Sequence, residues 1–177
     1  MTKSVHVPQK VRDQVEAEVK RCKKIAEKTY GRKFLMPSIN YDKRGRTAGT
    51  ASDWLNSISL NSILLMENLD KFIDCRIDRG TVSHEFAHLV DSKVNPETRE
   101  GTFTGRYTKR GEPIYKRSVH GPTWRKIMRE FGGCLIALKR CHKYDTKNSK
   151  IKKRTRRKHV WICGCGKGKI TLTQMKH

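Results

Sequence analysis

Two histidines and a glutamate stand close together in the segment 81–90, which reads Thr-Val-Ser-His-Glu-Phe-Ala-His-Leu-Val. On a helix, His84 and His88 lie one turn apart on the same face, so both imidazoles can reach one metal ion. Glu85 lies beside that face, where its carboxylate can take a proton from a water that Zn²⁺ has made more acidic. The spacing therefore predicts a catalytic zinc centre.

A catalytic zinc needs a third protein ligand and one open position. The metzincin arrangement is excluded, because Asp91 and Val94 occupy the positions where its glycine and third histidine would fall. His120 is the strongest candidate, because it directly precedes a predicted helix and a fixed backbone there can direct its ring. Asp91 either orients a ligand histidine or is a solvated helix acid. The carboxylate alternatives to His120 are Glu97, Glu100 and Glu112.

The elements that must position these residues follow from hydrophobic periodicity and from Gly and Pro punctuation. The pattern predicts an α+β fold in which helices pack on one side of a small sheet. Helices are expected over 8–30, 61–69, 79–93 and 122–140, strands over 34–41, 47–51 and 54–60, and a turn over 42–46. Residues 97–119 are polar and contain glycine, and their pattern assigns no element.

Several apolar residues are expected in the core of this domain. Ile58 and Leu60 alternate with serines, as in a half-buried strand. Trp54 and Trp124 follow strand and helix patterns that place them inside. The thiols of Cys22, Cys75 and Cys134 also fall in apolar patterns and are predicted to be buried.

The composition restricts the class of protein. The chain has 177 residues with 40 Lys and Arg against 17 Asp and Glu, a formal net charge of +23. No apolar run approaches the roughly 20 residues that span a bilayer, and the first residues have no apolar signal region. We therefore expect a protein that is neither exported nor membrane-bound, in a reducing compartment where cysteines are buried or bind metal.

The charge is concentrated near the C-terminus and suggests a polyanionic partner. Residues 139–177 hold fourteen Lys and Arg and a single acid, Asp145. Binding to a DNA or RNA backbone is the favoured interpretation, and a solvated linker is the alternative. The aromatic rings at Tyr107, Tyr144 and Trp161 could stack on single-stranded bases. The cations expected to contact phosphates are Lys152, Lys153, Arg154, Arg156, Arg157 and Lys158.

Three segments together resemble the SprT-like zinc metallopeptidases, a family that includes Spartan. They are the strand-like Ile58-Ser59-Leu60-Asn61 before a short apolar helix, the His120-Gly121-Pro122 motif with Trp124, and Arg140-Cys141-His142-Lys143-Tyr144. With the histidine motif they cover about residues 8–166. The resemblance implies a small zincin-like domain with the motif on a central helix. It also implies His84, His88 and His120 as ligands of one zinc, Glu85 as general base, and proteolysis of proteins bound or crosslinked to DNA.

The C-terminal part departs from that family. Cys163-Gly164-Cys165 looks like the first knuckle of a zinc ribbon, but no second cysteine pair follows. Cys141, Cys163, Cys165 and His177 could complete a second, structural zinc site, with His142 or His159 as substitutes. A degenerate ribbon that serves as a basic arm is the alternative.

We therefore expect a protease domain over 1–140 and a basic tail over 141–177. The predicted function is a zinc endopeptidase that acts on DNA-associated proteins, in the cytoplasm of a bacterium or phage or in a eukaryotic nucleus. The alternative is a non-catalytic, zinc-containing adaptor that binds nucleic acid. A nuclease is disfavoured, because two-metal nucleases require clustered carboxylates and the neighbours of this motif are mostly apolar.

Overall fold

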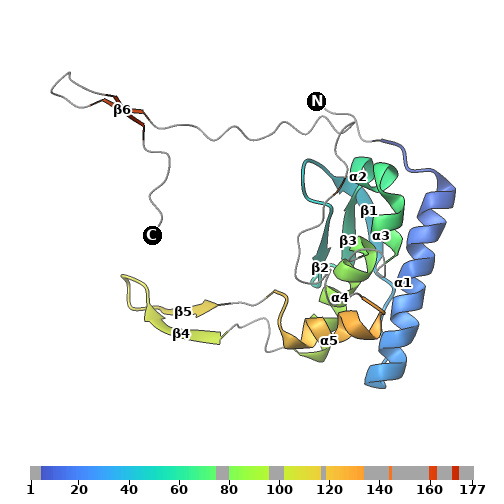
Figure 1. The fold of residues 1–177 in the computed structure, drawn as a ribbon. Coiled ribbons are helices and arrows are strands. Elements are labelled where there is room, and N and C mark those ends of the chain that lie inside the picture. The colour runs from blue at the N-terminus through green and yellow to red at the C-terminus, as the bar shows by residue number, and fades with distance from the viewer. Residues whose placement is uncertain are drawn as a thin grey trace.

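A computed structural model describes residues 5–74, 80–95, 102–116, 119–133, 144, 160–162 and 169–171. Its elements alternate between helices and short strands (Figure 1). In chain order they are α1 (Gln9–Tyr30), β1 (Ser38–Lys43), β2 (Gly49–Ser52), β3 (Ser57–Asn61), α2 (Ser62–Glu67), α3 (Leu69–Ile73), α4 (Thr81–Val94), β4 (Thr102–Tyr107), β5 (Pro113–Lys116), α5 (Pro122–Glu130), β6 (Val160–Ile162) and β7 (Lys169–Thr171).

The first three strands form a small mixed sheet in the order β1-β3-β2. β1 runs parallel to β3, whereas β2 pairs with β3 in the antiparallel direction and forms one edge of the sheet. Helix α4 lies at the centre of the domain and packs against α1, α3, α5 and the edge strand β2. The expected α+β class with a small sheet and packed helices is confirmed.

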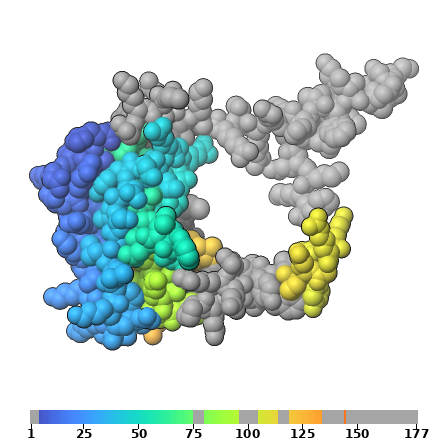
Figure 2. Space-filling view, turned by 180° about the vertical axis from the view of Figure 1, so that it is seen from behind, coloured from blue at the N-terminus to red at the C-terminus, as the bar shows by residue number. Residues whose placement is uncertain are grey.

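Helix α1 agrees closely with the segment predicted from 8 to 30. Its apolar residues at three- and four-residue steps, from Val11 to Ala26, face the core and are buried. The helix ends at Gly31, which adopts the left-handed conformation with φ 62° and donates its N–H to the carbonyl of Glu27. In Figures 1 and 2 this helix covers one flank of the domain.

The two tryptophan predictions had opposite outcomes. Trp124 is completely buried, as expected, and Ile58 and Leu60 also lie in the core. Trp54 does not, because its side chain is 91% exposed and the core prediction was wrong. The chain turns between β2 and β3 over residues 53–56, where Asn56 has φ 44°. Trp54 therefore lies at the tip of a turn rather than in a strand.

Other boundaries differ for local reasons. The strand expected from residue 34 begins at Ser38, and the helix expected over 61–69 is divided into α2 and α3 at Asn68. The helix expected to reach residue 140 ends at Glu130, because the chain leaves helical geometry at Gly132 with φ 89°. Cys22 is buried as predicted. Cys75, Cys134 and residues 134–140 lie outside the described residues.

The unassigned region 97–119 contains an antiparallel hairpin of β4 and β5, which projects away from the helices and the sheet (Figures 1 and 2). Its turn is closed by Thr108, whose hydroxyl accepts the backbone N–H of Arg110 and of Glu112. Gly105 and Gly111 both have positive φ there. The sequence pattern did not predict this hairpin, because side-chain hydrogen bonds and glycine conformations define it. Its strands do not show the alternation of apolar and polar residues by which a strand is recognised.

Much of the predicted tail lies outside the described residues. This applies to the basic run over 150–158, with its six predicted phosphate contacts, and to Cys141, Cys163, Cys165 and His177 of the second zinc site. Strands β6 and β7 form a short antiparallel pair. In the part of the chain that the structure describes, no helix is long and apolar enough to cross a membrane.

Tyr144 is described, and its environment differs from the expected stacking surface. Its ring lies 5.2 Å from the ring of Phe72, centroid to centroid, and its hydroxyl bonds to the hydroxyl of Thr81 at the start of α4. Tyr144 is half-buried against the domain and packs on the core. Tyr107, in contrast, is exposed on the β4–β5 hairpin.

Candidate metal centre

Helix α4 carries the first part of the centre and is fixed in place before the histidines begin. It starts after Gly80, whose carbonyl accepts the backbone N–H of His84. Ser83 is fully buried and donates its hydroxyl to the carboxylate of Glu18 on α1. This bond between two helices sets the position of the residue directly before His84.

The structure brings His84, His88 and His120 together, although 36 residues separate the first from the last. The Nε2 atom of His84 lies 3.2 Å from Nε2 of His88 and 3.1 Å from Nε2 of His120. One ligand atom from each residue lies within 4.8 Å of the other two. Three nitrogens held tetrahedrally at the usual Zn–N distance would be about 3.3 Å apart. The donor set therefore fits a small metal ion such as Zn²⁺.

His120 reaches the centre from the turn that precedes α5. Gly121 and Pro122 begin this helix, and Pro122 suits the first helical turn because its missing N–H has no helical partner there. The amide of Asn95, just after α4, donates to the hydroxyl of Thr123 at 3.1 Å. The end of α4 is thereby tied to the start of α5, which fixes the turn that carries His120.

Trp124 lies against all three imidazoles and is the residue whose role the sequence did not reveal. Its ring centroid is 4.8 Å from that of His84, 5.5 Å from that of His88 and 4.3 Å from that of His120. We predicted it only as a core residue. The signal that could have shown its role is the spacing of four residues from His120, which puts it on the first turn of α5.

Glu85 lies between α4 and the edge strand β2. Its buried carboxylate accepts the backbone N–H of Ala51. Burial raises the pKa of Glu85 to about 7, against smaller opposing effects of this hydrogen bond and of the Lys43 charge. A carboxyl group with this pKa can take up and release a proton near neutral pH.

The close approach of β2 to α4 depends on Gly49. A Cβ atom at this position would lie 2.9 Å from Cγ of Glu85 and 3.0 Å from Cγ2 of Thr81. Both distances are shorter than ordinary carbon contacts. The absence of a side chain at Gly49 therefore lets the edge strand reach the glutamate.

His88 is held in its neutral form. Burial lowers its pKa to about 4, and the neighbouring His120 adds to this effect. A neutral imidazole keeps the lone pair that a metal ion requires.

The remaining sequence candidates lie elsewhere. Asp91 is only 5% exposed, so the second of its two alternatives, a solvated helix acid, was wrong. Its Oδ1 atom has no hydrogen-bond partner among the described residues, and burial raises its pKa. Glu112 is exposed on the hairpin turn. Glu97 and Glu100 lie outside the described residues. Among the residues that the structure describes, the three histidines are the group that could hold a metal ion.

The chain is similar to bacterial proteins named SprT. It is 27% identical over 165 residues to protein SprT of Pseudomonas fluorescens strain Pf-5, a match that covers 93% of this chain and 82% of the relative. It is 29% identical to protein SprT of Pseudomonas syringae pv. syringae, again over 165 residues that cover 93% of this chain and 82% of the relative. Protein SprT of Pasteurella multocida is 28% identical over 152 residues, 86% of this chain and 73% of the relative.

No family model matches the chain. No solved structure matches it either. The similarity to the SprT proteins nevertheless extends over about nine-tenths of the sequence and supports the resemblance to the SprT-like proteins drawn from the motifs.

Proposed function

We propose that this protein is a zinc-dependent endopeptidase that acts on proteins bound or crosslinked to DNA. One observation carries the enzymatic part of this proposal. Three imidazole nitrogens from two separate segments converge within 4.8 Å, and a buried glutamate with a pKa near neutrality stands at the next position of the same helix. A purely structural zinc site has no use for such a carboxylate.

In this proposal His84, His88 and His120 hold Zn²⁺ through Nε2. A zinc ion bound there would polarise a peptide carbonyl and lower the pKa of water. The carboxylate of Glu85 takes the proton of the attacking water and passes it to the leaving amine. Because Trp124 packs against all three rings, it keeps the imidazoles from turning away from one another.

The position of the edge strand β2 favours a polypeptide as the substrate in this proposal. β2 pairs with β3 on one side only, among the described residues, and it lies directly beside Glu85. Apart from the Ala51 N–H, which donates to Glu85, this strand edge offers backbone N–H and C=O groups to an extended peptide, which can add to the sheet as a further strand. A peptide bound in this way would run past the proposed metal centre.

The DNA part of the proposal rests on charge and on family resemblance. The net charge of +23 would attract a polyanion, and fourteen of the 40 cations are in residues 139–177. Proteins bound or crosslinked to DNA are the substrates that the SprT-like resemblance implies.

The direct test uses the full chain with a protein crosslinked to a DNA oligonucleotide. Glu85→Gln should keep its zinc and its DNA affinity but lose cleavage, because only the proton acceptor is removed. His120→Ala should lose both zinc and cleavage. Glu130→Gln, an exposed glutamate on α5, is the matched control and should behave like the wild type. Undiminished cleavage by Glu85→Gln would remove this residue from the mechanism.

Zinc content separates the remaining alternatives. About one zinc per chain is expected if the histidine centre alone binds metal, and about two if Cys141, Cys163, Cys165 and His177 form a second site. Deleting residues 141–177 should remove only the second ion. A zinc-bound wild type that cleaves no DNA-bound protein under any condition would favour the adaptor function instead.

A further inference from the structure

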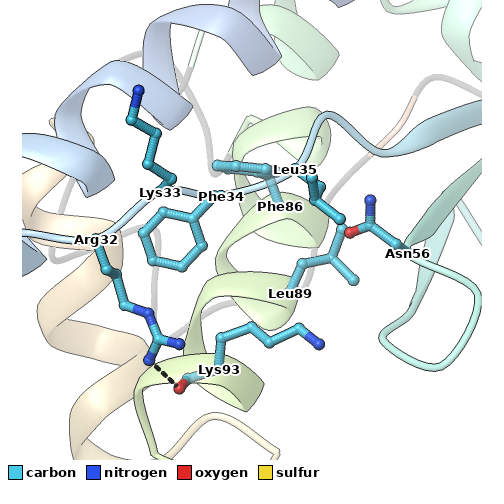
Figure 3. Close-up of a pocket in the computed structure, with 8 residues that line it drawn as sticks. All are labelled: Arg32, Lys33, Phe34, Leu35, Asn56, Phe86, Leu89 and Lys93. Carbon is cyan, nitrogen blue, oxygen red and sulfur yellow. Dashed lines mark hydrogen bonds between the residues drawn. The ribbon is translucent and has the colours of Figure 1, made fainter.

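A pocket of about 210 Å³ lies between α4 and the segment that precedes β1 (Figure 3). Its floor consists of the apolar side chains of Phe34, Phe86 and Leu89, and Leu35 stands at its rim. Since α4 has 3.6 residues per turn, Phe86 and Leu89 point away from His84 and His88. An occupant of this pocket would therefore leave the proposed metal centre open.

The rim of the pocket is positively charged. Arg32, Lys33 and Lys93 surround the apolar floor, together with the amide of Asn56. Arg32 already donates to the carbonyl of Lys93 at 2.8 Å, where it caps the end of α4 (Figure 3). Among the described residues, no carboxylate forms a salt bridge with Lys33 or Lys93. Lys23 forms the salt bridge with Glu27, on which the Lys33 charge also acts from a greater distance, so Lys33 and Lys93 remain available to an anionic partner.

An exposed apolar surface adjoins the pocket. The turn between β2 and β3 lies beside the segment before β1, since Asn56 donates its amide to the carbonyl of Met36 and accepts the N–H of Ser38 at its own carbonyl. Leu35 is 79% exposed, and Leu55 on that turn is 68% exposed. Isolated exposed apolar residues are common, but a group of them beside a pocket marks an interaction surface.

We infer that this pocket binds a short acidic segment of another protein that inserts one large apolar side chain between Phe34, Phe86 and Leu89. A volume of about 210 Å³ is below the range of about 300–1,000 Å³ typical of small-molecule sites and suits a single side chain. Flanking aspartates or glutamates would pair with Lys33 and Lys93. Apolar anchors in pockets with charged rims are a common mode of protein recognition.

Two other occupants fit less well. The basic C-terminal region of this chain has the same sign of charge as the rim and would be repelled. Single-stranded nucleic acid stacks its bases on exposed ring faces, but Phe34 and Phe86 are both buried. An acidic peptide with an apolar anchor matches both the positive charge of the rim and the apolar floor of the pocket.

The test measures binding of fluorescein-labelled heptapeptides to the full chain in the Glu85→Gln background, so that the result is independent of proteolysis. Each peptide has one central residue, Leu, Phe or Ser, between three glutamates on either side. The Leu and Phe peptides should bind and the Ser peptide should not. Lys33→Glu with Lys93→Glu should weaken binding by about tenfold or more, because attraction becomes repulsion. Leu35→Ser, which removes an apolar contact at the rim without changing the charge, should also weaken it.

The matched control carries the same charge change on the exposed face of α1, Lys10→Glu with Lys24→Glu, and should lose little affinity. Equal losses in the two double variants would show that only net charge matters and would overturn the proposal. Absence of binding by every peptide at millimolar concentration would overturn it as well. So would an oligonucleotide that displaces the peptide and loses affinity only in the Lys33 and Lys93 variant, because the surface would then bind nucleic acid.

Discussion

At the scale of single residues, burial has opposite effects on the pKa values of Glu85 and His88 but favours the neutral form of both. It raises the pKa of Glu85 to about 7 and lowers that of His88 to about 4. At neutral pH the metal-free centre therefore holds a neutral His88 and a Glu85 that is only partly ionised. A bound cation would compensate both effects, because it attracts the carboxylate and accepts the imidazole lone pair.

The raised pKa of Glu85 makes a prediction for the metal-free protein. A carboxyl group with a folded pKa of about 7 and an ordinary value of 4.5 stabilises the fold fully only below the ordinary value, and the stability falls as the pH rises through 7. Between about pH 5 and pH 7.5, the wild type should lose about 2 kcal/mol relative to Glu85→Gln. Urea unfolding in a chelator at both pH values measures this difference. Parallel pH profiles of the two proteins would contradict it.

A second prediction concerns Glu18, the buried acid that joins α1 to α4. It accepts two hydrogen bonds of 2.7 Å from Arg21, one from Ser83 and a longer one from the thiol of Cys22. Arg21→Ala would leave this carboxylate buried without its cation, and we expect a loss of about 3 kcal/mol. Lys20→Ala, which removes an exposed partner of Glu16, should cost less than about 1 kcal/mol. Denaturant unfolding of the two variants makes the comparison, and equal losses would show that the Glu18 network contributes little.

The sequence identified the residues of the centre better than their surroundings. His84 and His88 could be predicted from their spacing on one helix, and His120 from its position directly before the next predicted helix. The contacts of Trp124 with all three rings and the approach of Gly49 to Glu85 could not be found. Both depend on how α4 packs against α5 and β2, which is set by contacts between residues distant in the sequence.

At the scale of elements, the contact between β2 and α4 brings the sheet edge to Glu85. Gly49→Ala should place a methyl group 2.9 Å from Cγ of Glu85 and force the strand and the helix apart. We expect a loss of about 1–3 kcal/mol in stability and a larger fractional loss of peptidase activity than of zinc binding. Thr50→Ala is the control, because alternate residues of a strand face opposite sides. Unchanged activity in Gly49→Ala would show that the strand position does not matter.

How well each element could be predicted followed from the kind of signal that defines it. Helix α1 was found almost to the residue, because a long apolar stripe and a terminal glycine specify it. The turn with Trp54 was mistaken for a strand, since an exposed tryptophan cannot be distinguished from a core residue by composition alone. The β4–β5 hairpin was missed because its turn depends on the hydroxyl of Thr108.

At the scale of the whole molecule, charge divides the sequence more sharply than hydrophobicity does. Residues 34–96, which contribute the sheet and α4, carry seven Lys and Arg against eight acids. Residues 139–177 carry fourteen against one. In the proposed function the tail would attract DNA, while the segment with His84, Glu85 and His88 remains nearly neutral and can accept polypeptides of varied charge.

This division predicts how the salt dependence of DNA affinity should respond to charge removal. For every phosphate contact that is lost, the negative slope of log K against the logarithm of the salt concentration should become less steep by about 0.9 on double-stranded DNA. Replacing four tail cations by Gln should therefore flatten the slope by up to about 3.6. The four replaced residues are Lys152, Lys153, Arg156 and Arg157. The measurement is fluorescence anisotropy of a labelled duplex over a series of salt concentrations.

The matched control removes the same charge from α1. Its four exposed lysines are Lys10, Lys20, Lys24 and Lys28. Because both variants have the same net charge, a long-range effect of charge alone would change the two slopes equally, whereas direct phosphate binding by the tail would flatten only the first. Equal slopes would contradict direct binding by the tail. They would move the search for the DNA surface to other cations, of which Arg106, Lys109 and Arg110 on the exposed hairpin are the first to replace.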